Sequence, residues 1–243
     1  MLNVHVKLTG ALADAARRSA GQLQEHLSGP DGERVGDVDL ARGAHEPHVT
    51  LYMAEFREDQ LAPLLDAVRA TCAEVRAPEV RLGARVARGT YAFWECAPSD
   101  ELVALSTLLA LRCARFVARE RVERPTWFDH IAPARRELAE ANLRLFGSAG
   151  VGDLYDPHVT LANAPGADAV GAAVAALGGA EPAAFRAETV DVGRVGPGGT
   201  VLSGEDVASI AVTGSKPATL ACMSAQQNEI LRLRMDERAI RPG

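Results

Sequence analysis

The five residues PHVTL at positions 47–51 recur unchanged at positions 157–161, and this pair of segments decides how the chain is interpreted. At ordinary composition, a chance identity of five residues somewhere in a chain of 243 residues arises about one time in twenty. Both copies follow a loop and begin a stretch with the alternating pattern of a half-buried β-strand. The repetition therefore predicts two equivalent strands that carry the same chemistry.

Each segment places a histidine and a threonine two residues apart. Residues i and i+2 project from the same face of a strand, about 7 Å apart along the backbone, so an imidazole and a hydroxyl stand side by side. Two such strands can flank one phosphorus atom, where one histidine removes a proton and the other delivers one. The hydroxyls would hydrogen-bond the non-bridging oxygens. We therefore predict a catalytic set of His48, Thr50, His158 and Thr160.

The two His-Val-Thr-Leu segments, each followed by a helical pattern, resemble the 2H phosphoesterase superfamily, which includes 2′-5′ RNA ligase-like proteins and cyclic phosphodiesterases. The resemblance implies an α+β, bilobal fold with two antiparallel sheets around a central groove and outer helices. It also implies metal-independent chemistry with no cofactor, on 2′,3′-cyclic phosphates or 2′-5′ linked nucleotides. Residues 112–152 form a longer segment than in small bacterial members, and residues 214–243 are additional.

The expected elements of the second half of the chain repeat the order of the first half. Each motif strand is followed by a helix and then by a pair of strands, which indicates an architectural pseudo-repeat. We therefore expect one bilobal domain at 1–213 and a C-terminal extension at 214–243. The periodicity predicts strands at 4–8, 48–56, 80–86, 90–96, 158–162, 188–195 and 210–212, and helices at 12–27, 61–75, 100–116, 134–145, 167–177 and 226–238.

Three further side chains are candidates for the site. Tyr52 continues the face of His48 and Thr50, so we predict that it stacks on a nucleobase, with core packing as the alternative. His5 is predicted to bind substrate if its strand neighbours the first motif strand, with solvent exposure as the alternative. His45 lies three residues before His48, but that spacing does not converge on one ion, and no metal site is expected.

Composition narrows the range of partners and locations. The chain has 26 Lys and Arg against 32 Asp and Glu, for a formal net charge of −6. Such a charge does not suit a protein that coats long nucleic acid, whereas a nucleotide or a short RNA end is compatible. No apolar run approaches the roughly 20 residues needed to span a membrane, so we expect a cytoplasmic protein. The four scattered cysteines contain no Cys-x-x-Cys pair and are expected to be reduced.

The leading hypothesis is a metal-independent phosphodiesterase that hydrolyses a cyclic or 2′-5′ phosphodiester in a nucleotide or RNA end. Two alternatives remain open. An RNA 2′-5′ ligase would use the same residues in the opposite direction, and a non-catalytic module would bind a phosphorylated ligand without turnover. The near-symmetry of the two motifs leaves open which histidine is the acid and which the base, and nothing in the pattern indicates an oligomeric state.

Overall fold

The computed structural model describes residues 1–28, 35–125, 128, 132–180 and 182–217, and the expected helix at 226–238 lies outside them. Eight strands and five α-helices make up the described fold. The strands are β1 Leu2–Lys7, β2 His48–Ala54, β3 Glu79–Arg88, β4 Tyr91–Ala97, β5 His158–Asn163, β6 Ala183–Arg186, β7 Thr189–Val195 and β8 Val201–Ala211. The helices are α1 Gly10–Leu27, α2 Leu61–Glu74, α3 Asp100–Cys113, α4 Pro133–Phe146 and α5 Ala167–Leu177.

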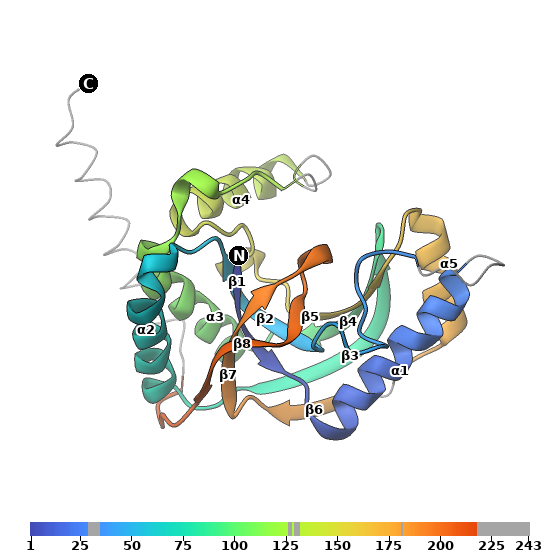
Figure 1. Ribbon diagram of the computed structural model, residues 1–243, viewed down its shortest axis with the longest axis horizontal. Helices are drawn as coiled ribbons and strands as arrows, with labels where there is room; N and C mark the ends of the chain where they lie inside the picture. The colour runs from blue at the N-terminus through green and yellow to red at the C-terminus, as the bar shows by residue number, and fades with distance from the viewer. Residues whose placement is uncertain (29–34, 126–127, 129–131, 181, 218–243) are drawn as a thin grey trace.

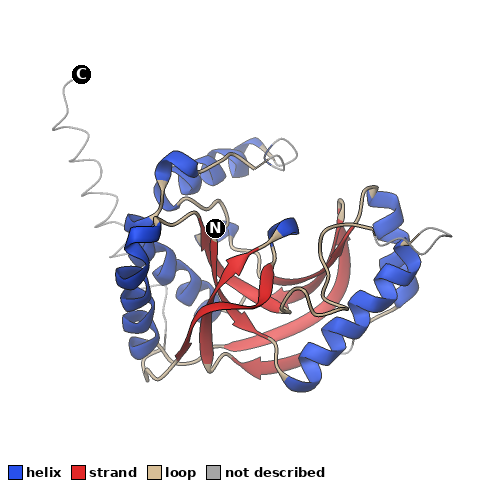
Figure 2. Cartoon of the chain, in the orientation of Figure 1, coloured by secondary structure: helices blue, strands red, loops and turns tan. Residues whose placement is uncertain are grey.

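Two four-stranded sheets organise the chain (Figure 2). The first sheet has the order β2-β1-β7-β8 and the second the order β5-β4-β3-β6. Every pairing in both sheets is antiparallel. Helices α2 and α3 contact the first sheet, and α1 and α5 contact the second, so the helices lie outside the sheets (Figure 1). The predicted α+β class with two antiparallel sheets and outer helices is confirmed.

The strands that follow each motif pair with the other half of the chain. β3 and β4 come after the first motif strand, β2, but they join the sheet of β5. β7 and β8 come after the second motif strand, β5, but they join the sheet of β1 and β2. This exchange leaves β2 and β5 at the edges of their sheets, where the two strands contact each other. The fold therefore brings together segments that are far apart in sequence.

The two sheets and their helices share one hydrophobic core. Fully or almost fully buried side chains come from β1, β2, α2, α3 and β5, and examples are Val4, Leu51, Leu64, Leu105 and Leu161. Burial of such side chains contributes roughly 1.5–3 kcal/mol each relative to leaving them exposed. Because this core runs beneath both motif strands, it fixes the backbone from which the histidines project.

α4 lies at the top of the view in Figure 1. Its residue Ala139 forms a small buried cluster with Phe128 and Ala149, apart from the main core. The Asn142 side chain stabilises the following loop by donating to the carbonyls of Ala149 and Val151 at 3.0 and 2.8 Å. The side chain of Asn142 in α4 therefore supports the loop that leads into β5.

Most predicted elements match the observed ones, and the differences have local causes. Ser99 caps α3 as its sequence context predicts, since its hydroxyl accepts the backbone N–H of Leu102 at 3.2 Å. The strand expected at 210–212 extends over Val201–Ala211. The prediction was too short because exposed polar residues at the centre of the strand interrupt its apolar pattern. β6 has four residues and was not predicted. Among the described residues, no helix is long and apolar enough to cross a membrane.

Candidate active site

The two motif histidines are held in the same way. His48 and His158 each begin an edge strand. The Nδ1 atom of His48 lies 2.7 Å from the carbonyl of Glu46, and that of His158 lies 2.8 Å from the carbonyl of Asp156. A carbonyl only accepts, so Nδ1 carries the proton in both rings and Nε2 presents a lone pair. Both imidazoles are therefore set to accept a proton at Nε2.

Burial keeps both imidazoles uncharged. The pKa of His48 falls from 6.5 to about 3, mainly because its ring is buried and then because of the nearby charge of His5. A smaller lowering of the His48 pKa comes from the charge of a protonated His158. Burial lowers the pKa of His158 as well, while the carbonyl and charge of Asp156 oppose that effect. Near neutral pH, both rings are therefore free bases.

The threonine of the first motif is oriented by a neighbouring strand. Thr50 Oγ1 accepts a hydrogen bond from Asn3 Nδ2 at 2.8 Å. Among the described residues, none accepts the Thr50 hydroxyl proton, so that proton is available to a ligand. Thr160 is partly exposed on β5, where it pairs with Phe93 of β4. Both threonine side chains are therefore only partly buried on their strands.

An aromatic row flanks the second motif. The ring of Phe93 packs on His158 with centroids 4.1 Å apart, and Tyr91 stacks on Phe93 at 5.7 Å. Arg88 forms ion pairs with Asp156 and with Glu95 beside this row. Because Asp156 also supplies the carbonyl that holds His158, the ion pair stabilises the loop that positions the imidazole.

The placement predicted for Tyr52 is wrong. The pairing of β1 with β2 shifts between Val4 and His5, which leaves Leu51 as an extra residue on β2. Beyond this bulge the alternation is inverted, so Tyr52 turns into the core with 2% of its surface exposed. Its hydroxyl donates to the carbonyl of Phe146. A ring buried in this way cannot stack on a nucleobase, and the alternative of core packing is the observed one.

His5 lies beside the site but is not exposed to a ligand. It pairs with Thr50 across the two strands, and its ring meets that of His48 edge-on with centroids 5.1 Å apart. Its exposed fraction is 0%, which contradicts direct contact with substrate as well as the solvent-exposed alternative. Its Nδ1 donates to the carbonyl of Asn3 at 3.0 Å. His5 therefore acts on the site only through His48.

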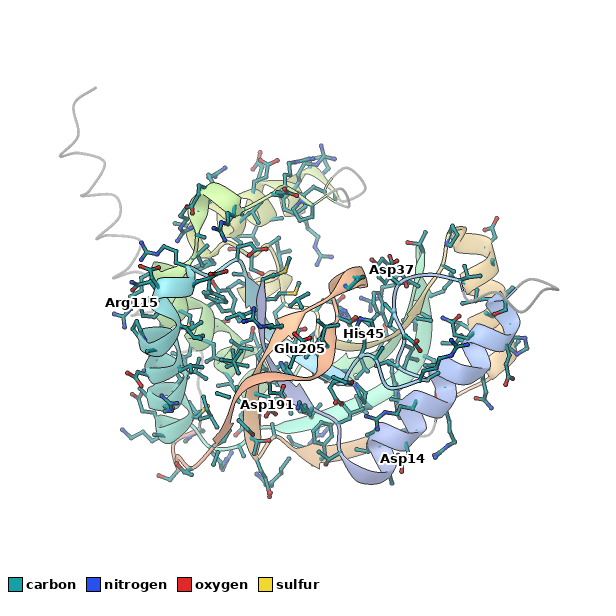
Figure 3. The ribbon with its side chains drawn as sticks, in the orientation of Figure 1. Asp14, Asp37, His45, Arg115, Asp191 and Glu205 are labelled. Atoms are coloured by element: carbon teal, nitrogen blue, oxygen red, sulfur yellow. The ribbon has the colours of Figure 1, made fainter. Side chains whose placement is uncertain are left out.

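His45 lies in the segment that leads into β2, where it forms an isolated β-bridge (Figure 3). Its Nδ1 accepts the backbone N–H of Asp39 at 3.0 Å. Across the described ranges, no group of three or more His, Cys, Asp and Glu side chains has the arrangement of a metal site.

Two residues that contact the motif were missed in the sequence. Asn3 shares a strand face with His5, so the period-two pattern could have identified it. Tyr155 donates from its hydroxyl to the carbonyl of Thr50 at 2.8 Å and joins the loop before the second motif to the first motif. No sequence signal links Tyr155 to Thr50, because that contact depends on how β2 and β5 meet.

Comparison with known proteins agrees with this fold. The two-sheet fold and the paired motifs define a protein of the two-histidine phosphoesterase class. A model of the 2′-5′ RNA ligase superfamily matches residues 13–198, and the chain belongs to that family. The predicted resemblance is thereby confirmed. No curated protein matches the chain.

The chain is also similar to solved structures. TT0787 of Thermus thermophilus is 16% identical with a TM-score of 0.55, and the match covers 88% of this chain and 99% of that one. LigT of E. coli, solved with NADP+, is 14% identical with a TM-score of 0.49, and the match covers 87% of this chain and 97% of that one. At these identities the likeness to TT0787 concerns the fold alone.

Proposed function

We propose that the protein is a phosphodiesterase that hydrolyses a cyclic or 2′-5′ phosphodiester in a nucleotide or RNA end. The observation that carries the proposal is the matched anchoring of His48 and His158, each with Nδ1 bound to the carbonyl two residues earlier and Nε2 unprotonated. Two equivalent bases on contacting strands are suited to move protons on opposite sides of one phosphorus atom. Membership in the 2′-5′ RNA ligase superfamily supports this class of substrate.

Hydrolysis of a 2′,3′-cyclic phosphate would proceed by attack of water on phosphorus. One histidine accepts a proton from the water as the new P–O bond forms, and the other protonates the ribose oxygen as its bond to phosphorus breaks. One of the imidazoles must therefore gain a proton before the reaction. A bound phosphate anion favours protonation of the imidazole, because negative charge beside an imidazole raises its pKa.

His158 is the group we expect to carry that proton. Asp156 and the carbonyl that it supplies act against the lowering of the His158 pKa, whereas His48 has a pKa of about 3. Thr50 and Thr160 would donate hydrogen bonds to the non-bridging oxygens, where charge is held in the transition state. The scheme assigns both proton transfers to imidazoles and calls for no metal ion.

A substrate panel tests the proposal. The panel contains 2′,3′-cyclic and 3′,5′-cyclic nucleotides, 2′-5′ and 3′-5′ dinucleotides, and RNA with a 2′,3′-cyclic phosphate end, all assayed in EDTA with products identified by mass spectrometry. We expect turnover of a 2′,3′-cyclic or 2′-5′ substrate, and a loss of about 10² to 10⁴ in rate for His48→Ala. Tight binding without turnover, unchanged in His48→Ala, would instead identify a binding module.

The same residues can catalyse ligation, because a 5′-hydroxyl can replace water as the nucleophile that attacks the cyclic phosphate, while one histidine still accepts its proton and the other protonates the leaving ribose oxygen. RNA halves carrying a 2′,3′-cyclic phosphate and a 5′-hydroxyl are therefore included in the panel. Formation of a joined 2′-5′ product in preference to hydrolysis would assign ligation as the direction.

A further inference from the structure

Asn3 places a buried amide against both functional groups of the first motif. Its Nδ2 atom donates to Thr50 Oγ1 at 2.8 Å and lies 3.4 Å from Nε2 of His48. The residue is on β1, the neighbour of β2 in the first sheet, and its exposed fraction is 0%. One amide group thus contacts the atoms that are proposed to hold the phosphate and to move a proton.

The other end of the same amide has no partner. Asn3 Oδ1 is buried and makes no hydrogen bond to any described residue. A buried, unsatisfied polar atom costs about 1–3 kcal/mol. The hydrogen bonding of Asn3 is therefore complete only on the side that faces Thr50 and His48, which points to a role at the site.

Within the described part of the chain, no amide side chain is hydrogen-bonded to His158 or Thr160 of the second motif. Across the strand pairs, His5 faces Thr50 on β1, and Phe93 faces Thr160 on β4. Two residues before these positions stand Asn3 and Tyr91, so the amide in the first half corresponds to an aromatic ring in the second. The two halves therefore share the motif but not the group that contacts it.

We propose that Asn3 is a positioning residue, which turns the Thr50 hydroxyl proton toward the substrate and holds Nε2 of His48 as a proton acceptor. The inference rests on the proposed function of these two residues. The Asn3 N–H occupies one lone pair of the Thr50 oxygen, so the hydroxyl proton is directed away from Asn3. Asn3 Nδ2 also lies 3.4 Å from His48 Nε2, and this donor favours the unprotonated ring, because a protonated Nε2 would meet another donor.

Two replacements of similar size separate this role from packing. Asn3→Asp keeps the shape but replaces the N–H donor with a carboxylate, and Asn3→Leu removes both polar atoms. In Asn3→Asp, the pKa of His48 followed by NMR is expected to rise by about one unit or more, since an anion lies beside the ring. In Asn3→Leu, kcat on the preferred substrate is expected to fall about 10- to 100-fold through loss of orientation.

Met53→Leu is the matched control. Met53 pairs with Asn3 across the strands, and its sulfur is 3.8 Å from Asn3 Nδ2, so the change alters the other neighbour of the amide at nearly constant volume. This variant is expected to keep the wild-type kcat and His48 titration. Thermal unfolding of each variant establishes that it folds.

The outcomes for the inference and for the proposed function differ. An unchanged His48 titration in folded Asn3→Asp would overturn the inference even if the wild type is active. The inference would also be overturned if Asn3→Leu had the kcat and the pH–rate profile of the wild type. Failure of the wild type to turn over any substrate would overturn the proposed function, while the titration would still test the contact between Asn3 and His48.

Discussion

Replacement of His48 by glutamine is expected to make the protein less sensitive to acid. The folded protein holds His48 with a pKa of about 3, whereas the unfolded chain has a value near 6.5 and binds a proton readily. A lowered imidazole pKa contributes stability that is complete above pH 6.5 and is lost as the pH falls toward 3. Within that window, each pH unit lowers the free energy of unfolding by about 1.4 kcal/mol.

Between pH 7 and pH 5, this linkage lowers the stability of the wild type by about 2 kcal/mol more than that of His48→Gln. Urea unfolding of both proteins at pH 7, 6 and 5 measures the difference. The same substitution at His26, an exposed residue of α1, controls for the loss of an imidazole as such. Equal losses of stability in the wild type and in His48→Gln would refute the view that His48 is held uncharged by burial.

Four other substitutions test the motifs and the residues that support them. Thr50→Val and Thr160→Val are each expected to lower kcat by about 10² to 10³, since each removes a donor to the phosphate; steady-state kinetics measures this. Tyr155→Phe removes the 2.8 Å hydrogen bond to the Thr50 carbonyl and is expected to lower the free energy of unfolding by about 1–3 kcal/mol in urea. Gly36→Ala is expected to lower the melting temperature, because Gly36 has φ +85° and an added Cβ would lie 1.8 Å from the Asn163 carbonyl. An unchanged melting temperature would contradict the tight contact at Gly36.

The local patterns of the sequence were sufficient to predict the elements that carry the site. The apolar stripe at 61–75 predicts a helix that the structure has as α2, Leu61–Glu74. The motif strands are likewise found where alternation places them, as β2 and β5. These elements are predictable because their periodicity depends only on which face is buried.

The features that the sequence did not reveal depend on tertiary pairing. A bulge at Leu51 reverses the alternation of β2 and moves Tyr52 into the core, and nothing in the alternation itself marks the extra residue. The exchange of strand pairs between the halves, which brings β2 against β5, is also invisible in local periodicity. For that reason, the roles of Asn3 and Tyr155 became apparent only from the structure.

The central claim is that His48 and His158 act together on one phosphorus atom. Kinetics of His48→Ala, His158→Ala and the double variant on the preferred substrate test it most directly. We expect each single variant to lose about 10² to 10⁴ in kcat. The double variant is expected to lose little more than the less active of the two single variants, since the residues act as a unit. Losses that multiply in the double variant, or a single variant with wild-type kcat, would contradict the claim.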